Sequence, residues 1–196
     1  HCVGVGECGV AARSDDGGAT WTTVIPADCT SQKTLEGVVF RDASHAIAVG
    51  IDTVIASSDG GTTWTSSLPP SDQELRGVTF VDANNGFIAG GHQQDQGTIL
   101  HTSDGGVTWD VQRNDLPQPV TSLAFANAND GIGVCLDGSI LRTHDGGATW
   151  RFDAYTLSNL YAVVHRDSAT AIAVGFSNYN AAVIAWDDRT FANGFD

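Results

Sequence analysis

Residues 75–109 read LRGVTFVDANNGFIAGGHQQDQGTILHTSDGGVTW, and this stretch decides the fold. Three short β-type runs, LRGVTF, GFIAGG and TILHTS, are bounded by turn residues, and a fourth run, TWDVQR, begins at the end of the stretch. A tight Asp-Gly-Gly turn at Asp104 joins the third run to the fourth. Four antiparallel strands within about 40 residues are typical of one blade of a β-propeller.

The same pattern recurs along the whole chain. The segments SDDGGATW, SSDGGTTW, TSDGGVTW and THDGGATW contain the aligned aspartates Asp16, Asp59, Asp104 and Asp145, which are 43, 45 and 41 residues apart, and they end at Trp21, Trp64, Trp109 and Trp150. A fifth segment, AWDDRTF, keeps an aspartate at Asp188 but has lost both glycines and the tryptophan. We interpret it as a decayed fifth copy of the repeat.

The other copies predict equivalent strands. The second copy gives LEGVVF (35–40), AIAVG (46–50), TVIASS (53–58) and TWTSSL (63–68), and the fourth gives VTSLAF, GIGVC, SILRTH and TWRFDA. The fifth copy supplies LYAVVH, AIAVG and AAVIAW, whereas the first opens at CVGVG and lacks its innermost strand. We therefore expect the chain to start and to stop inside a blade.

We predict an all-β fold, a β-propeller of four-stranded antiparallel blades in which the Asp-Gly-Gly turns join strands 3 and 4. The expected repeats lie within a single propeller domain of residues 1–196, at approximately 1–29, 30–72, 73–117, 118–157 and 158–190, followed by a tail at 191–196. The final segment, TFANGFD, matches no blade strand, and we interpret it as a tail for export or attachment. Five complete blades need about one more strand and loop than the chain has, so ring closure stays open.

Each repeated aspartate has a structural role that needs no ligand. Its carboxylate can accept hydrogen bonds from backbone NH groups of the turn that follows, and a Ser or Thr hydroxyl two residues earlier can join the same network. The glycine pair supplies positive φ angles, and the tryptophan covers the turn. Because the four turns are equivalent and lack an EF-hand-like series of oxygen ligands, we interpret them as structural elements and not as catalytic acids or calcium sites.

The aspartate pattern SxDxGxTW resembles the Asp-box, or bacterial neuraminidase repeat, of sialidases, sortilin-type receptors and several glycoside hydrolases. The fuller period, LxGVxFxDxxxGxAVGxxGTILxTxDGGxTW, is similar to the repeat of the photosystem II assembly and stability factor family, and residues 75–109 match it almost position for position. The resemblance extends from about residue 2 to residue 188. It implies a propeller, more often of seven blades than of five, and it implies little about function because these repeats occur in proteins with unrelated tasks.

Composition excludes several classes of protein. The formal net charge is −14, which repels phosphate and argues against a nucleic-acid partner. No apolar run approaches the ~18 residues of a transmembrane helix, and Met is absent, so His1 is expected to be the end of a processed form or a fragment. No motif indicates a metal or a cofactor: GVGECG satisfies a GxGxxG count, but no helix follows it and it aligns with a hairpin between blade strands.

The four cysteines, Cys2, Cys8, Cys29 and Cys135, match no metal or redox spacing. Three of them lie within the first 29 residues, which favours a local disulfide in an oxidising compartment and hence a secreted or periplasmic protein. Four cysteines allow three pairings, among which the sequence does not choose. We take Cys8–Cys29 as the first hypothesis, with reduced core cysteines as the alternative.

Candidate binding residues are those at which the copies differ. After the apolar residue that opens each first strand, the next position holds Glu36, Arg76, Thr121 and Tyr161, and the position after that is always small. A chemically variable column on a repeated scaffold is where side chains can be selected for a ligand, although ordinary solvent exposure also explains it. Loops expected on the same face of the propeller add the candidates His92, Gln93, Asp95, Asn178 and Tyr179.

These observations favour a binding or assembly module without catalytic activity, exported, and engaging a protein or a glycan through the channel mouth. The alternative is a sialidase-like or other glycoside hydrolase propeller. The Asp-box resemblance implies for sialidases an arginine triad, a Tyr and Glu nucleophile pair and an Asp acid and base. Here Glu36, Arg76 and Tyr161 share one column, but no converging arginines and no pair of carboxyls can be assigned.

The photosystem relatives imply a basic patch for partner engagement, whereas this acidic chain has one lysine, Lys33. The oligomeric state is left open.

Overall fold

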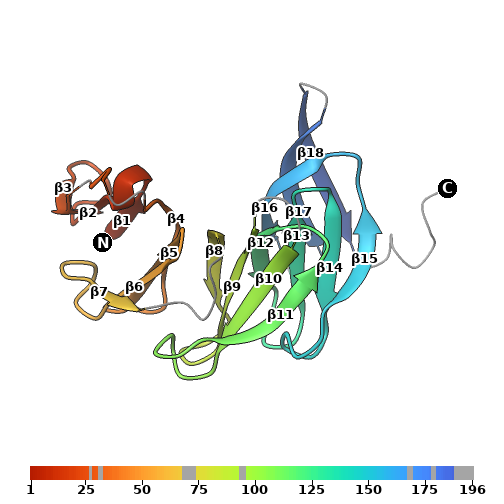
Figure 1. The fold of residues 1–196 in the computed structure, drawn as a ribbon, viewed down its shortest axis with the longest axis horizontal. Coiled ribbons are helices and arrows are strands. Elements are labelled where there is room, and N and C mark those ends of the chain that lie inside the picture. Colours follow the sequence, from red (N-terminus) through yellow and green to blue (C-terminus); the bar gives the residue numbers. More distant parts are fainter. Residues whose placement is uncertain are drawn as a thin grey trace.

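The computed structural model describes residues 1–26, 28–30, 33–67, 74–92, 96–166, 170–177 and 180–187, and all of the extended segments pair into antiparallel sheets. Five sheets follow one another along the chain; in Figure 1 the first three run from left to right, and the last two lie together on the right. We number them sheet 1 to sheet 5. Within the described part of the chain, the one helical segment is a single 3-10 turn, η1 (Glu7–Gly9), and no helix is long and apolar enough to cross a bilayer.

Each sheet is a simple up-and-down meander. Sheet 1 contains β1 (Cys2–Val5), β2 (Ala11–Ser14) and β3 (Thr22–Ile25), and sheet 2 contains β4 (Leu35–Phe40), β5 (Ala46–Gly50), β6 (Thr53–Ser57) and β7 (Thr65–Ser67). Sheet 3 contains β8 (Glu74–Phe80), β9 (Gly86–His92), β10 (Gln96–Thr102) and β11 (Asp110–Leu116). Sheet 4 contains β12 (Val120–Phe125), β13 (Gly131–Cys135), β14 (Ser139–Thr143) and β15 (Arg151–Tyr155), and sheet 5 contains β16 (Asn159–His165), β17 (Thr170–Ser177) and β18 (Asn180–Asp187).

This arrangement confirms the predicted all-β class and the four-stranded blade. Sheets 2, 3 and 4 have four strands each, and β4, β5, β12 and β13 have the bounds that the sequence predicts. Sheet 1 starts at the strand that is second in the other blades, because β1 pairs with β2 across the turn that contains η1. The segment GVGECG is therefore part of a hairpin, as predicted, and not a phosphate-binding loop.

The fourth strands begin later than predicted. The prediction placed their first residues at Thr63, Thr108 and Thr149, whereas β7, β11 and β15 begin two residues further on. In each case the threonine donates both its backbone NH and its hydroxyl to the aspartate of the preceding turn. These threonines belong to the turn, so strand pairing begins only after the tryptophan that follows them.

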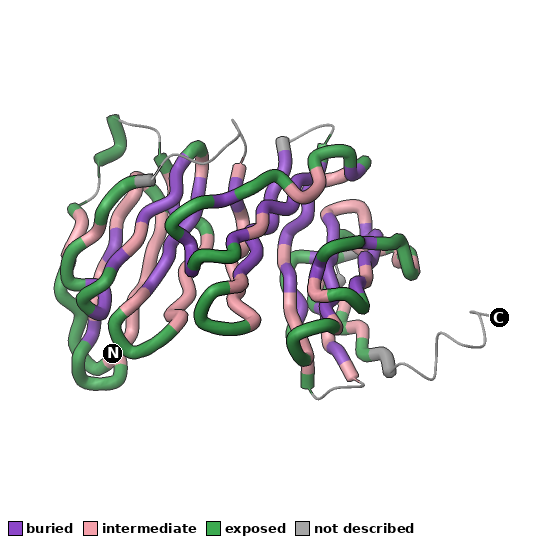
Figure 2. The backbone as a smooth tube through the Cα atoms, turned by 90° about the horizontal axis from the view of Figure 1, so that it is seen from below, coloured by how far each residue is buried: buried purple, intermediate pink, exposed green. Residues whose placement is uncertain are grey.

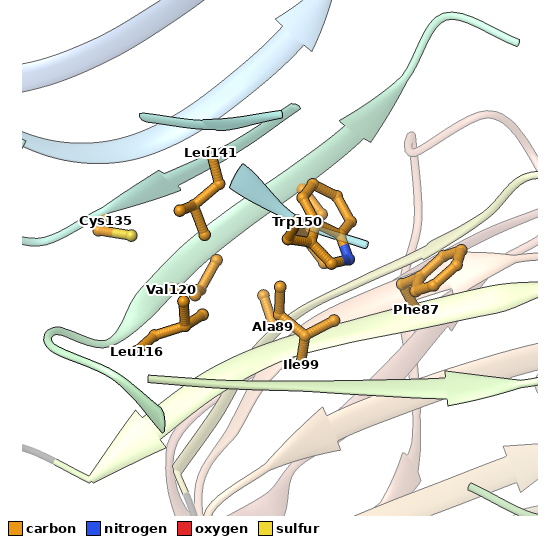
Figure 3. Packing of buried hydrophobic residues seen from close by; sticks show 9 residues of the cluster. Phe87, Ala89, Ile99, Leu116, Val120, Cys135, Leu141 and Trp150 are labelled. Atoms are coloured by element: carbon orange, nitrogen blue, oxygen red, sulfur yellow. The ribbon is translucent and has the colours of Figure 1, made fainter. Parts of the chain in front are cut away.

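The core consists of layers between neighbouring sheets, visible in Figure 2 as buried segments on the strands. The layer between sheets 3 and 4 is drawn in Figure 3, where Trp150 and Leu141 of sheet 4 lie above Ala89 and Ile99 of sheet 3. Phe87 stacks on Phe125 with ring centroids 4.8 Å apart and meets Trp150 edge to face. Both faces of a middle sheet are therefore buried, as in a propeller, which explains runs such as AIAVG that are apolar without interruption.

The innermost strands of neighbouring sheets approach backbone to backbone. A Cβ atom added at Gly37 would lie 2.9 Å from the carbonyl oxygen of Arg76, and one added at Gly77 would lie 3.2 Å from that of Thr121. Further along, the Ser122 hydroxyl oxygen accepts a hydrogen bond from the backbone NH of Val163 at 3.3 Å. This close approach explains why the position after the variable column is small in every copy.

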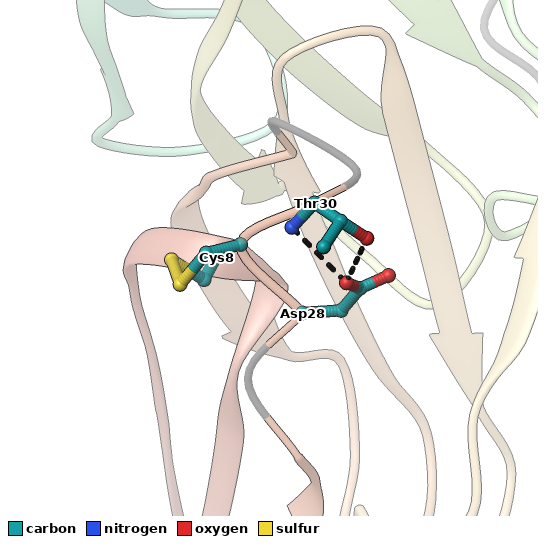
Figure 4. Close-up of a disulfide and its surroundings, with 4 residues drawn as sticks. Cys8, Asp28 and Thr30 are labelled. Atoms are coloured by element: carbon teal, nitrogen blue, oxygen red, sulfur yellow. Dashed lines mark hydrogen bonds between the residues drawn. A yellow bond between two sulfur atoms is a disulfide. The ribbon is translucent and has the colours of Figure 1, made fainter.

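A disulfide between Cys8 and Cys29 confirms the first-choice pairing. It ties η1 to the segment after β3, where Asp28 accepts hydrogen bonds from the backbone NH and hydroxyl of Thr30 (Figure 4). The Asp28 backbone NH in turn donates to the Cys8 carbonyl at 2.8 Å. Of the two free cysteines, Cys135 is buried in sheet 4, and burial raises the pKa of its thiol to about 12, so this thiol stays protonated at neutral pH.

The array is open in the described part of the chain. The extensive contacts between sheets join each sheet to the next, through β1 and β4, β4 and β8, β8 and β12, and β12 and β16. Figure 1 shows sheet 1 at the left of the array, and sheet 5 at the right together with sheet 4. The predicted continuation at Asp188 and the predicted tail at 191–196 lie outside the described residues.

Candidate functional site

The four aspartate turns have nearly identical hydrogen bonds. In the turn of sheet 3, Asp104 Oδ1 accepts from the Thr102 hydroxyl and from the backbone NH of Thr108, and Oδ2 accepts from the Thr108 hydroxyl at 2.6 Å. The Thr102 oxygen in turn accepts from the backbone NH of Gly106 at 2.8 Å. The turns of the other blades repeat these contacts through Asp16, Asp59 and Asp145.

These donors stabilise the ionised carboxylates. The pKa of Asp59, Asp104 and Asp145 is held at about 2, below the ordinary 3.8, and that of Asp16 is lowered as well. The largest cause in every case is the hydroxyl of the threonine four residues later. Each carboxylate accepts at least three hydrogen bonds from its own turn, so the turns are poorly suited to act as general acids or to bind a cation.

The aspartate turns also hold neighbouring sheets together. In the turns of sheets 2, 3 and 4, the second glycine receives an apolar side chain from the preceding sheet: Val3 lies against Gly61, Ile47 against Gly106, and Phe87 against Gly147. Arginines add polar links on the same side, because Arg13 Nε donates to the Gly60 carbonyl at 2.8 Å and Arg41 Nη1 donates to the Gly105 carbonyl at 2.6 Å. The contacts on this side of the molecule therefore hold neighbouring sheets together.

The variable column lies near the other end of the blades. Register shifts fall between Leu35 and Gly37, between Leu75 and Gly77, between Val120 and Ser122, and between Leu160 and Ala162. Each shift is a β-bulge, and its extra residue is the variable one. We call these residues the bulge column: Glu36, Arg76, Thr121 and Tyr161. A bulge re-aims the extra side chain, and here it does so at the same place in four successive inner strands.

Glu36 and Arg76 meet in the structure. Arg76 Nη2 donates to Glu74 Oε2 at 2.7 Å, and its Nη1 lies 3.7 Å from Glu36 Oε2. All three side chains are partly exposed, at 22% for Arg76, 28% for Glu36 and 19% for Glu74. One guanidinium therefore lies between two carboxylates, and this cluster has a net charge of −1.

Thr121 and Tyr161 differ from that pair. Thr121 is buried, and its hydroxyl lies 2.9 Å from the carbonyl oxygen of Val134 and 2.8 Å from that of Leu160 in the next sheet. It can donate to one of these carbonyls at a time, so its position is explained by the joint between two blades. Tyr161 is 51% exposed. The column therefore offers a charged pair and an aromatic ring, with a structural threonine between them.

Glu74 was missed by the sequence analysis. It opens β8 two residues before Arg76, and side chains two apart on a strand point to the same side, so this alternation was the available signal. The bulge at Arg76 obscured that signal because it shifts the alternation by one residue. Of the predicted loop candidates, the backbone of His92 ends β9, while Gln93, Asp95, Asn178 and Tyr179 lie outside the described residues.

Comparison with known proteins establishes the architecture. No protein-family profile and no curated protein matches the sequence. Among solved structures, "YCF48 bound to D1 peptide" superposes with a TM-score of 0.60 at 23% identity over 80% of this chain and 55% of that one. YCF48 from Cyanidioschyzon merolae gives 0.65 at 15% identity over 93% and 64% of the two chains.

An ancestral GH74 enzyme gives a higher TM-score of 0.74, at 14% identity, over 95% of this chain but 30% of that one. The chain thus spans between about a third and about two thirds of the length of these proteins. Identities this low establish shared architecture and not shared chemistry. On the combined evidence of sheets, register and superposition, the chain has the β-propeller fold, built of repeats similar to those of the YCF48 structures.

Proposed function

We propose that the chain is a non-catalytic binding or assembly module, and that residues 1–196 form one propeller domain that engages a polypeptide segment through the bulge column. The observation that carries this proposal is the contrast between the two ends of the blades. The aspartate turns use their polar groups on themselves. The bulge column repeats one backbone geometry and varies its side chains, which is how a repeat protein builds a specific surface.

The charges favour a basic partner. Two carboxylates, Glu36 and Glu74, flank one guanidinium, and the whole chain has a formal net charge of −14. A lysine or arginine side chain can pair with the carboxylate that Arg76 engages less closely, and the exposed Tyr161 ring can accept a cation on its face. A polypeptide partner is also consistent with the similarity to a YCF48 structure described as bound to a D1 peptide.

Export is part of the proposal. The Cys8–Cys29 disulfide supports an oxidising compartment, secreted or periplasmic, because structural disulfides persist there and are rare in the cytosol.

The geometry gives little support to a glycoside hydrolase. Such enzymes need one protonated carboxyl and one carboxylate facing each other across the substrate, whereas Glu36 and Glu74 both face the same guanidinium. Among the described arginines, Arg13 and Arg41 bind glycine carbonyls on the aspartate-turn side, so these two do not converge with Arg76 as a sialidase-type triad would require.

The test is peptide selection on the immobilised chain followed by affinity measurement. We expect a random peptide library displayed on phage to yield sequences rich in Lys and Arg, whose affinity falls with salt. A Glu36→Gln/Glu74→Gln variant should weaken the selected peptides about tenfold, equivalent to about 1.4 kcal/mol. Val107→Ser, at an exposed residue of an aspartate turn, is the matched control and should leave the affinity unchanged.

Selected peptides that bind both variants equally would overturn the assignment of the site. Failure of the selection, together with a glycan-array signal that disappears in Glu36→Gln/Glu74→Gln, would replace the polypeptide by a glycan. Hydrolysis of a β-glucan or a sialoside that the same variant abolishes would replace the binding function by an enzymatic one.

A further inference from the structure

Sheet 5 exposes an apolar face that its counterparts bury. We call the side of a sheet that faces the next sheet along the chain its forward face, and the opposite side its rear face. In sheet 2 the forward face carries Ile47, Val49 and Val54, which pack against Leu75, Ile88 and Leu100 on the rear face of sheet 3. The layers between sheets 3 and 4 and between sheets 4 and 5 are built in the same way.

Equivalent residues show how much is left uncovered. One column of the forward faces holds Val49, Ala89 and Val134, each 0% exposed, and continues at Val174, which is 42% exposed. A second column holds Val54 at 0%, Ile99 at 0% and Ile140 at 1%, and continues at Val183, which is 71% exposed. Val183 lies directly opposite Val174 in the pairing of β17 with β18. Val164 and Phe176 extend the same face, at 58% and 47% exposure.

Sheet 1 exposes the complementary half of such a layer. In the other blades the tryptophan after the aspartate turn lies on the rear face, where Trp109 and Trp150 are 7% and 4% exposed. Trp21 holds the same position in sheet 1 and is 49% exposed. It stands over Gly4, which pairs with Ala12, and Ala12 pairs with the exposed Thr23. The rear face of sheet 1 is thus a shallow surface of small residues beside one large ring.

We propose that the forward face of sheet 5 packs on the rear face of sheet 1 of a second copy of the chain. The forward face of sheet 5 repeats the branched residues that the other forward faces bury. The rear face of sheet 1 keeps the tryptophan of the other rear faces but has Gly4 and Ala12 where the rear face of sheet 3 has Ile88 and Leu100, so bulky residues on one side meet a shallow surface on the other. Within the described residues the extensive contacts join only successive sheets, so sheet 5 and sheet 1 do not pack on each other in one copy. In the proposed contact, one face of each copy is covered by the other copy.

The contact is heterologous, because it joins two different surfaces. Such a contact adds copies one after another until the assembly closes on itself. Each copy has a formal net charge of −14, so the copies repel each other at low ionic strength. Because the contact is apolar and the repulsion is screened by salt, association becomes stronger as salt is added. This dependence is the reverse of that expected for peptide binding at the bulge column.

Three lysine substitutions test the contact. Val183→Lys blocks the forward face of sheet 5, and Thr23→Lys blocks the rear face of sheet 1; both residues are exposed, so each copy can fold with the lysine in solvent. Val107→Lys is the matched control, since Val107 is 74% exposed, close to the 71% of Val183, but lies on an aspartate turn. Mass is measured by light scattering over about a hundredfold range of concentration, at low and at high salt.

We expect the unmodified chain and Val107→Lys to exceed the 20.5 kDa of one copy at high concentration, and to do so more readily in salt. Val183→Lys and Thr23→Lys should each stay at the mass of one copy. Mixed in equal amounts, these two variants should form a dimer that grows no further, because each brings one intact face. Hydrogen exchange on the unmodified chain should show protection gained with concentration in β1, β3, β17 and β18.

Several results would overturn the proposal. The unmodified chain could stay at the mass of one copy at every concentration and salt level. Thr23→Lys could associate like the unmodified chain, which would mean that sheet 5 pairs with another sheet 5. The mixture of the two variants could also stay monomeric. If a variant fails to fold by circular dichroism, the hydrogen-exchange experiment on the unmodified chain decides alone, and absence of concentration-dependent protection in β17 and β18 refutes the contact.

Discussion

The two ends of the blades both repeat one backbone conformation from copy to copy, but they differ in whether the side chains are repeated as well. At one end, the aspartate turns repeat both their conformation and their polar side chains, and each carboxylate accepts bonds from its own turn. At the other end, the inner-strand bulges repeat their conformation but change side chain from Glu36 to Arg76 to Thr121 to Tyr161. A position that is repeated in both respects is explained by folding, whereas one repeated only in its backbone is free for recognition.

The largest effect is expected at the turn end, where a turn supports the neighbouring sheet. Gly147 has a φ of 85°, and a Cβ there would lie 2.5 Å from the Phe87 ring, so Gly147→Ala should lower the free energy of unfolding by about 3 kcal/mol. Gly18 occupies the same turn position in sheet 1, with a φ of 96° and only ordinary contact with Trp21. Gly18→Ala should therefore cost only the backbone strain, about 1 kcal/mol. Urea unfolding of both variants measures the difference, and equal losses would show that the contact between sheets contributes nothing.

Acid should weaken the turn end next. The pKa of Asp59, Asp104 and Asp145 is about 2 in the folded chain and 3.8 ordinarily, so their stabilisation is complete above about pH 4 and is lost as the pH falls through about 2. Thermal unfolding between pH 5 and pH 2 checks this. Asp104→Asn should lower the melting temperature at neutral pH and make its decline with acid shallower. A variant with an unchanged decline would show that this carboxylate does not titrate as described.

A smaller effect is expected inside the bulge column, where Thr121 is the exception to the contrast. Thr121→Val removes the hydroxyl between the carbonyls of Val134 and Leu160 and keeps the shape, so it should lower the free energy of unfolding by about 1 to 2 kcal/mol. Thr121→Ser keeps the hydroxyl and is the control in the same denaturation experiment. If Thr121→Val is as stable as the unmodified chain, the joint between sheets 4 and 5 does not depend on this hydroxyl.

The smallest effect on stability is expected at Tyr161, which is 51% exposed. Tyr161→Ala should change the free energy of unfolding by less than about 0.5 kcal/mol while weakening the selected peptides in the same buffer. Loss of stability without loss of affinity would reverse its assignment and make it a structural residue. Chemical denaturation and a fluorescence titration on one preparation separate these two results.

The repeat made most of the fold predictable. Strong local signals, namely apolar runs bounded by turn residues and four copies of one turn, predict strands such as β5 and β12 to the residue. The sequence did not choose among the three cysteine pairings, and the Cys8–Cys29 bond of the structure agrees with the first hypothesis. The starts of the fourth strands were less predictable, because a threonine at this point can either pair within the strand or donate hydrogen bonds to the aspartate four residues earlier. The bulges were not predicted, because an extra residue in one strand becomes visible only against its partner.

The candidate site was predictable in part for a related reason. Comparison of the copies singles out Arg76, but it does not show that Glu74 and Glu36 flank its guanidinium, because one is in the same strand across a bulge and the other is in a different blade. Nor does it show that the Thr121 hydroxyl is buried between the carbonyls of Val134 and Leu160 whereas Tyr161 is half exposed. Partners from other sheets decide the role of each side chain.

The close approach at Gly37 and Gly77 has a consequence for design. Where inner strands meet main chain against main chain, the spacing and tilt from one blade to the next depend on peptide groups and hardly at all on the neighbouring side chain. The curvature of the array then depends little on which side chains stand at the bulges of the inner strands. Bulge residues other than Thr121 can be exchanged to bind a new target while the scaffold keeps its shape, provided that the small residue beside each of them stays small.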